Sequence, residues 1–158
     1  MQATEIAPMS AAQAREVLAW RYAPPYDVYN MAVDDVTAEA AYMADPANHD
    51  YSLLRGDELI GHAVFYHEAQ VPGGDYPDGA LDVGWGLRPD ATGRGLGTVV
   101  VPVILAFGRG RYGVRCFRAT VAAWNTRGIA VCVRNGFTES SRFHHSRTGS
   151  EFVILTTG

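Results

Sequence analysis

The stretch Arg88-Pro-Asp-Ala-Thr-Gly-Arg-Gly-Leu-Gly-Thr98 decides the fold, because it joins two segments of different character. A strand-like segment, residues 80–87, runs into it, and an apolar segment, residues 99–107, runs out of it. Glycines let a backbone approach an anion closely, and the first N–H groups of a helix are unpaired and point toward such an anion. The order of strand, glycine loop and helix therefore predicts a turn that binds phosphate.

Length and composition indicate a single globular domain spanning residues 1–158. The chain is 47% hydrophobic and 19% charged, which is typical of a folded protein. No apolar run reaches the roughly 18 residues of a membrane span, and no signal peptide is visible, so we expect a cytoplasmic protein without a membrane partner. Cys116 and Cys132 lack metal-site spacing, so we expect free thiols and no metal.

Charge is unevenly distributed along the chain. Residues 1–80 carry 13 acidic and 3 basic residues, whereas residues 81–158 carry 4 acidic and 10 basic ones. The basic half contains the glycine loop, which suits an anionic ligand. Because the whole chain is acidic and lacks a nucleic-acid motif, we expect no nucleic-acid partner.

Hydrophobic periodicity, caps and turn residues predict an alternation of strands and helices. We expect helices at 11–21 (capped by Ser10), from Asp34 or Asp35 to 43, at 97–111 and at 126–134. We expect strands at 4–9, 51–55, 58–68, 80–87, 114–122, 137–145 and 151–156. This order indicates an α/β, or layered α+β, fold with a mixed sheet.

Two familiar phosphate loops do not fit the glycine stretch. A Walker loop requires a lysine, and the chain contains none. A dinucleotide loop requires the spacing G-x-G-x-x-G and an acidic residue about 20 positions later, whereas this chain has G-x-G-x-G and no acid between Asp90 and Glu139. A turn that only caps the following helix is the remaining structural alternative.

The loop resembles the pyrophosphate loop of the GNAT acyltransferase family, Gln/Arg-x-x-Gly-x-Gly/Ala. Gly95 and Gly97 occupy its small positions, Thr92 replaces the usual Gln or Arg, and Arg94 lies inside the loop. Downstream, the family's Asn…Gly-Phe pattern is matched by Asn125, Gly128, Gly136 and Phe137. The resemblance implies a mixed, mostly antiparallel sheet of six to seven strands flanked by about four helices.

The resemblance also implies acetyl-CoA as cosubstrate, with the pantetheine arm along the backbone near Leu87. The pyrophosphate would bind the loop, and the Asn125 side chain would reach the pantetheine or the phosphates. The expected coenzyme-binding residues are Leu87, Arg88, Thr92, Gly93, Arg94, Gly95, Leu96, Gly97, Thr98 and Asn125.

Proton-transfer residues are less clear in the sequence. Many members place a tyrosine acid seven residues after the motif asparagine, and here that position is Cys132, a weak donor that also suits the core. Asp82 is the acidic residue of the strand at 80–87 and a candidate base, or else the partner of an arginine. His62 and His67, on the neighbouring predicted strand, are alternative bases acting through water.

Residues 20–29 and 71–78 are the candidate walls of an acceptor site. The first segment holds four aromatic residues and two prolines, and Asp27, Asp75 and Asp78 make the two segments acidic. We therefore expect a cationic acceptor, either a small-molecule amine or a peptide N-terminus, attacked directly in a ternary complex. The rival hypothesis is a catalytically weak acyl-CoA-binding sensor or scaffold. The sequence leaves monomer or homodimer open.

Overall fold

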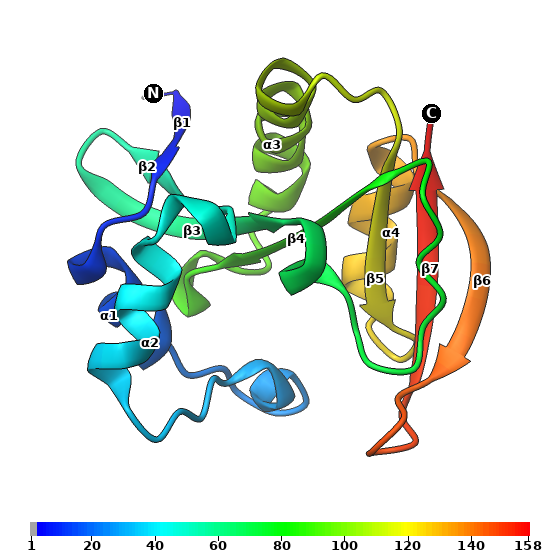
Figure 1. Ribbon diagram of the computed structural model, residues 1–158, viewed down its shortest axis with the longest axis horizontal. Helices are drawn as coiled ribbons and strands as arrows, with labels where there is room; N and C mark the ends of the chain where they lie inside the picture. The colour runs from blue at the N-terminus through cyan, green and yellow to red at the C-terminus, as the bar shows by residue number, and fades with distance from the viewer. Residues whose placement is uncertain (1–2) are drawn as a thin grey trace. The chain divides into compact units, whose positions relative to one another are not determined.

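The computed structural model describes residues 3–158 and contains seven strands that form one mixed sheet in the order β1-β2-β3-β4-β5-β7-β6 (Figure 1). The strands are β1 (Thr4–Pro8), β2 (Asp50–Arg55), β3 (Glu58–Phe65), β4 (Leu81–Leu87), β5 (Phe117–Ala122), β6 (Thr138–His144) and β7 (Glu151–Thr157). The helices are α1 (Ala11–Ala19), α2 (Val36–Ala44), α3 (Leu96–Tyr112) and α4 (Thr126–Arg134). The predicted fold class is therefore confirmed.

Short 3₁₀ helices add detail that the sequence patterns do not predict: η1 (Tyr26–Tyr29), η2 (Pro46–Asn48), η3 (Tyr66–Ala69) and η4 (Pro89–Ala91). The predicted strand at 58–68 is too long, because β3 ends at Phe65 and the chain turns into η3. Tyr66 adopts a φ of 69°, a left-handed conformation that interrupts an extended strand. Strand β5 also differs from its prediction, because it begins at Phe117 and not at residue 114.

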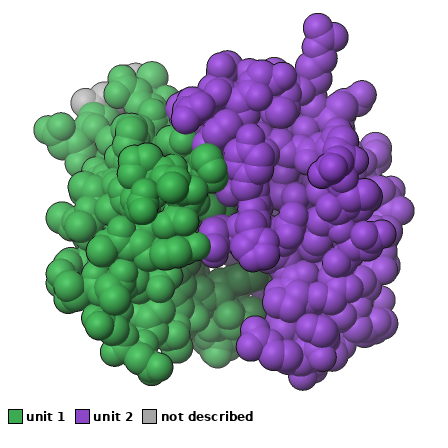
Figure 2. All heavy atoms as spheres, viewed as in Figure 1, with its two compact units in different colours: residues 1–64, 85–100 green, residues 65–84, 101–158 purple. Residues whose placement is uncertain are grey.

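The chain forms two compact units (Figure 2). Among the described residues, unit 1 comprises 3–64 and 85–100, and unit 2 comprises 65–84 and 101–158. The chain passes from one unit to the other within or beside β3, β4 and α3. The expectation of a single domain stays a prediction.

Unit 1 is built around helices α1 and α2 and strands β1 to β3. Ser10 caps α1 in a reciprocal pair with Gln13, and the Asp35 carboxylate accepts a hydrogen bond from the first turn of α2. The apolar faces of these helices pack with β3 in a core of Met9, Ala14, Val17, Leu18, Ala40, Met43 and Leu59. The Gly56-Asp57 turn joins β2 and β3 as an antiparallel hairpin, as predicted.

Unit 2 contains the antiparallel strands β5, β7 and β6, together with α4 and most of α3. Its buried core includes Phe65, Ile104, Phe117, Phe137 and Leu155. At Gly108 an added Cβ would lie 2.7 Å from the Phe117 ring, so this turn of α3 can approach the aromatic core only as glycine. Strands β4 and β5 pair in parallel at Leu81 and Asp82, which places Asp82 opposite Arg118.

Candidate active site

The glycine segment forms an exposed turn between β4 and α3. Gly93 and Gly95 adopt φ values of 73° and 76°, a backbone conformation that side chains disfavour, and α3 begins at Leu96. Gly93, Arg94 and Gly95 are exposed, and a Cβ added at Gly95 would meet no atom within 4 Å. The backbone before α3 therefore borders open space, in the arrangement that helix N-termini use to bind anions.

The side chains of Arg88 and Thr92 form hydrogen bonds that hold this segment in shape. The Arg88 guanidinium contacts Glu58 Oε1 at 2.6 Å and Asp90 Oδ1 at 2.5 Å, and donates to the Leu59 carbonyl at 3.1 Å. These hydrogen bonds raise the pKa of Arg88 and lower that of Asp90. The Thr92 hydroxyl donates to the Pro89 carbonyl at 2.8 Å. Both side chains thus stabilise the turn that leads into the glycines.

The last peptide group of β4 is bonded at both of its polar ends. The Arg88 N–H donates to the Ile60 carbonyl of β3 at 2.8 Å. The Tyr22 phenol donates to the Leu87 carbonyl at 2.6 Å. Burial raises the pKa of Tyr22 to about 12, so the phenol remains a hydrogen-bond donor through the neutral range.

His62 lies beside the same part of β4. A Cβ added at Gly86 would be 2.7 Å from His62 Nε2, so glycine at this position makes room for the imidazole ring. His62 Nδ1 is buried and has no hydrogen-bond partner among residues 3–158. Burial lowers the pKa of His62 to about 4, which keeps the imidazole neutral at pH 7. The other candidate histidine, His67, is exposed in η3.

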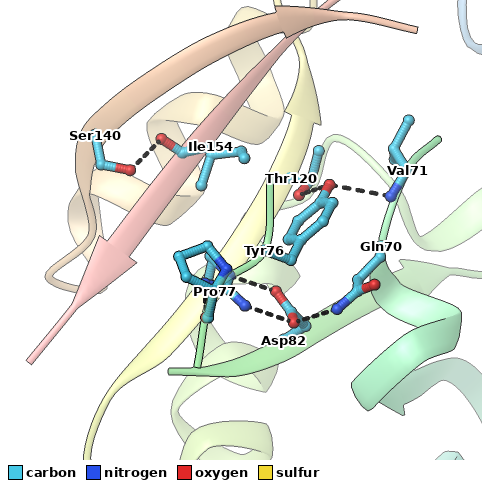
Figure 3. Close-up of polar contacts among 9 residues, drawn as sticks. Gln70, Val71, Tyr76, Pro77, Asp82, Thr120, Ser140 and Ile154 are labelled. Carbon is cyan, nitrogen blue, oxygen red and sulfur yellow. Dashed lines mark hydrogen bonds and ion pairs between the residues drawn. The ribbon is translucent and has the colours of Figure 1, made fainter. Parts of the chain in front are cut away.

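Asp82, a predicted base, is the centre of a buried polar network in unit 2 (Figure 3). Its Oδ1 accepts from Arg118 Nε at 2.6 Å, and its Oδ2 accepts from Arg118 Nη2 and from Gln70 Nε2, each at 2.9 Å. Arg118 also donates to the Pro77 carbonyl at 2.8 Å. Only 5% of Asp82 is exposed, so its carboxylate is enclosed by the groups that hydrogen-bond to it.

The loop at 71–78 is anchored through Tyr76. The Tyr76 hydroxyl accepts from the Val71 N–H at 3.0 Å and pairs with the Thr120 hydroxyl at 2.9 Å (Figure 3). The Arg118 guanidinium lies over the Tyr76 ring, 5.1 Å from its centroid. The Ser146 N–H donates to the Pro72 carbonyl at 3.1 Å. This candidate wall of the acceptor site is therefore a fixed part of unit 2.

Cys132 and Asn125, predicted as acid and coenzyme ligand, both belong to α4. The Cys132 side chain is fully buried, and burial raises the pKa of its thiol to about 12. Asn125 caps the helix by accepting from the Gly128 N–H at 2.9 Å. An added Cβ at Gly128 would lie 2.7 Å from Asn125 Nδ2, so the glycine makes room for this cap. The functional roles of both residues stay predictions.

The structure thus brings together residues that sequence reasoning did not connect. Tyr22 lay in the predicted aromatic segment, but nothing in the sequence indicated its bond to Leu87, 65 residues away. The alternative prediction that Asp82 pairs with an arginine is confirmed by Arg118, whereas Gln70 was not predicted as its second partner. Among residues 3–158, no group of three or more His, Cys, Asp and Glu side chains is placed to bind a metal, and no helix is long and apolar enough to cross a membrane.

Solved structures define the class of fold to which this architecture belongs. A GNAT-family acetyltransferase from Bacillus anthracis aligns with a TM-score of 0.74 and 14% identity, covering 98% of this chain and 94% of the other. Aminoglycoside acetyltransferase AAC(6')-Ib, in complex with coenzyme A and kanamycin, aligns with a TM-score of 0.73, 17% identity and coverage of 98% and 94%. A chimera of the spermidine N-acetyltransferase SpeG from Vibrio cholerae and hSSAT aligns with a TM-score of 0.71, 12% identity and the same coverage.

The sequence itself identifies the family. The family model described as Acetyltransferase (GNAT) domain matches residues 1–138, whereas a comparison with curated proteins finds no match. The chain therefore belongs to the GNAT acetyltransferase family, which confirms the resemblance carried by the glycine loop and by Asn125.

Proposed function

We propose that this chain transfers an acetyl group from acetyl-CoA to a primary amine by direct attack in a ternary complex. The single observation that carries the proposal is the exposed glycine turn, whose left-handed Gly95 borders open space at the start of α3. Family membership supports it, and structural relatives were solved with acetyl-CoA or coenzyme A. A helix cap alone would not require the turn to border open space.

The pyrophosphate would bind the backbone N–H groups of residues 93–97, where the partial positive charge of the α3 N-terminus adds to the attraction. Arg94 and Thr98 are exposed on this segment and are proposed as additional donors. Leu96 contributes through its backbone. We assign Arg88 and Thr92 to holding the shape of the turn, because their side chains are already bonded within it.

Transfer forms a C–N bond at the acetyl carbon and breaks the C–S bond of the thioester. The amine must be neutral to attack, the carbonyl oxygen must be stabilised, and the departing thiolate must gain a proton. We assign stabilisation of the oxygen to the Leu87 N–H. This donor belongs to the backbone, so it does not depend on the side chain at that position.

Two residues are proposed as alternative acceptors of the amine proton. Asp82 is ionisable, but it is enclosed by Arg118 and Gln70. His62 is neutral at pH 7 and lies against Gly86, next to Leu87. The variants Asp82→Asn and His62→Gln are compared as kcat per folded molecule, because Asp82→Asn also disrupts the buried pair with Arg118. On that scale, loss of the true base lowers kcat by about 10²-fold or more, while the other variant keeps the rate.

The acceptor is proposed to be cationic. Asp27 is exposed in η1, within the aromatic segment at 20–29, next to the exposed apolar side chain of Val28. Two structural relatives carry names that refer to amine-rich compounds, aminoglycosides and spermidine. An acidic and aromatic surface is suited to bind such polyamine chains.

The decisive experiment measures thiol release from acetyl-CoA over a panel of amines. The panel includes spermidine, kanamycin, a peptide with a free N-terminus and the acidic amine glutamate, each corrected for hydrolysis without acceptor. We expect turnover with the cationic members. If coenzyme A binds but no amine supports turnover, the chain is a sensor or scaffold and the catalytic proposal is wrong.

A matched pair of charge variants tests the acceptor class. Asp27→Asn is expected to raise the KM for a polycationic acceptor and to leave the KM for a monoamine nearly unchanged. Glu16→Gln, which removes one exposed charge from α1, is the control. Preference of the parent protein for glutamate would contradict a cationic acceptor.

A further inference from the structure

The Leu87–Arg88 peptide group is held from two opposite directions within unit 1. In a trans peptide the N–H and the C=O point in opposite directions. Because the Arg88 N–H donates to Ile60 of β3, the Leu87 carbonyl points away from β3. The Tyr22 phenol meets this carbonyl at 2.6 Å, so Tyr22 lies on the edge of β4 that faces away from β3.

The backbone N–H of Leu87 points to that same edge. In an extended strand the N–H and C=O of one residue lie on the same side, and Leu87 is the last residue of β4. Parallel pairing of β4 with β5 involves Leu81 and Asp82, at the opposite end of the strand. The phenol of Tyr22 is therefore a neighbour of the N–H that the proposed function directs at the acetyl carbonyl.

Tyr22 is itself fixed by its surroundings. Its backbone N–H donates to Asn30 Oδ1 at 2.7 Å, which closes the segment between residues 22 and 30 into a loop. The side chain is partly buried, and its hydrogen bond to Leu87 is short. A phenol that is anchored in this way fixes the direction of the peptide group to which it donates.

We propose that Tyr22 is a positioning residue for acetyl transfer. Its hydrogen bond fixes the Leu87–Arg88 peptide group and so, through the Leu87 backbone, helps keep the N–H of the preceding Gly86–Leu87 peptide directed at the acetyl carbonyl. The inference rests on the proposed function. It also makes the donor strand dependent on segment 20–29, which is the proposed acceptor wall. The position of segment 20–29 then affects the Leu87 backbone beside the thioester through the hydrogen bond from Tyr22.

The test compares Tyr22→Phe with the parent protein in the thiol-release assay, using the amine that gives the highest rate. Phenylalanine keeps the ring and removes the hydroxyl. We expect kcat and kcat/KM for acetyl-CoA to fall together by about tenfold, the size expected from one lost hydrogen bond. The Kd for coenzyme A is expected to change less than about twofold. Coenzyme A has no acetyl carbonyl, so its binding does not depend on the contact that Tyr22 positions.

Two further variants exclude a merely structural effect. Tyr42→Phe removes an exposed phenol from α2 and is the matched control in the same unit, with kcat unchanged. A 3-fluorotyrosine at position 22 restores the hydroxyl, so the rate recovers. Because fluorination lowers the phenol pKa, the alkaline loss of kcat then begins at a lower pH than in the parent.

The outcomes separate this inference from the proposed function. If the parent protein turns over and Tyr22→Phe has the same kcat, the positioning role is wrong while acetyl transfer stands. Thermal unfolding measures the fraction of folded protein. If a smaller folded fraction accounts for the whole loss of kcat in Tyr22→Phe, the positioning role is also wrong. If no amine supports turnover of the parent, the proposed function fails, and the role of Tyr22 fails with it.

Discussion

His62 and Asp82 are two enclosed ionisable residues whose surroundings differ sharply. Asp82 in unit 2 receives three hydrogen bonds from Arg118 and Gln70. His62 in unit 1 has a buried Nδ1 that no group within residues 3–158 satisfies. A buried polar group without a partner reduces stability, whereas a fully bonded one belongs to the scaffold.

The difference shows that residue type alone does not indicate which group is available for chemistry. The carboxylate of Asp82 is a candidate base in the sequence, yet its two oxygens accept three hydrogen bonds in the structure. The imidazole is less obvious in the sequence, but its ring meets a glycine beside the end of β4. Variants at Arg118 and His62 test this contrast between a bonded carboxylate and an unpartnered imidazole directly.

Loss of Arg118 is expected to have the largest effect on stability. Arg118→Met leaves a buried carboxylate without its cation, and breaking such a pair costs about 3–5 kcal/mol. The double variant Arg118→Met with Asp82→Leu is expected to regain most of that loss, because no unpaired charge remains. Urea unfolding measures both. A cost below about 1 kcal/mol for the single variant would mean that the pair is not part of the scaffold.

Acid is expected to destabilise the fold through His62. The pKa of His62 is about 4 in the folded protein and about 6.5 when unfolded, so the unfolded chain binds the proton first as the pH falls. Stability is complete above pH 6.5 and declines toward pH 4, by about 3 kcal/mol for this group. Urea unfolding across this range measures the slope.

The control for this pH dependence is a pair of histidine variants. His62→Leu is expected to flatten the slope between pH 6.5 and 4, because the titrating group is gone. His67→Leu, at an exposed position in η3, is the matched variant. Equal slopes for the parent protein and His62→Leu would contradict the assignment of His62 as the enclosed, unpaired group.

The glycine turn is tested by two glycine-to-alanine variants in the same stretch of chain. Gly95→Ala places a side chain at φ 76° and is expected to cost about 1 kcal/mol, with no steric clash in the free protein. If the turn binds pyrophosphate, the affinity for coenzyme A falls by a further tenfold or more, because the new methyl group occupies the approach. Isothermal titration calorimetry measures it.

Gly110→Ala, near the end of α3, is the control for this experiment. Its new methyl group also meets nothing within 4 Å, and alanine is the better helix former by about 1 kcal/mol. We expect a small gain in stability and unchanged coenzyme affinity. A turn that only caps the helix would give the same affinity in both variants.

The smallest expected effect concerns the two thiols. Cys132 is fully buried with a raised pKa, whereas Cys116 is partly exposed. Iodoacetamide is expected to label Cys116 in the folded protein and Cys132 only after unfolding, since the thiolate is the reactive form. Mass spectrometry distinguishes the two. Rapid native labelling of Cys132 would show that its thiol can be reached.

Much of the fold was predictable because it depends on local signals. Helix α4 spans residues 126–134 as predicted, and Ser10 caps α1 as expected. The end of β3 was not predictable, because strand-forming residues continue past it. Tyr66 adopts the left-handed conformation that ends the strand, and no glycine marks this position in the sequence.

The candidate site was predictable only in its local part. The glycine turn depends on neighbouring residues, so its spacing could be read directly. Tyr22 lies 65 residues from Leu87, and Arg118 lies 36 residues from Asp82. No local sequence signal identifies which residues form such distant pairs. Burial of Cys132 likewise depends on packing of unit 2, which a motif position does not reveal.

The backbone hydrogen bond between Ser146 and Pro72 affects which amino-acid substitutions the two loops that it joins can tolerate. Its loop at 71–78 is rich in Gly, Pro and Asp, a composition that indicates a mobile connection. Yet the Ser146 N–H holds the Pro72 carbonyl, and an added Cβ at Gly73 would lie 2.5 Å from the His144 carbonyl. A substitution that moves the turn between β6 and β7 therefore also moves the loop at 71–78. We expect a substitution in one segment to be tolerated better when the other segment changes with it.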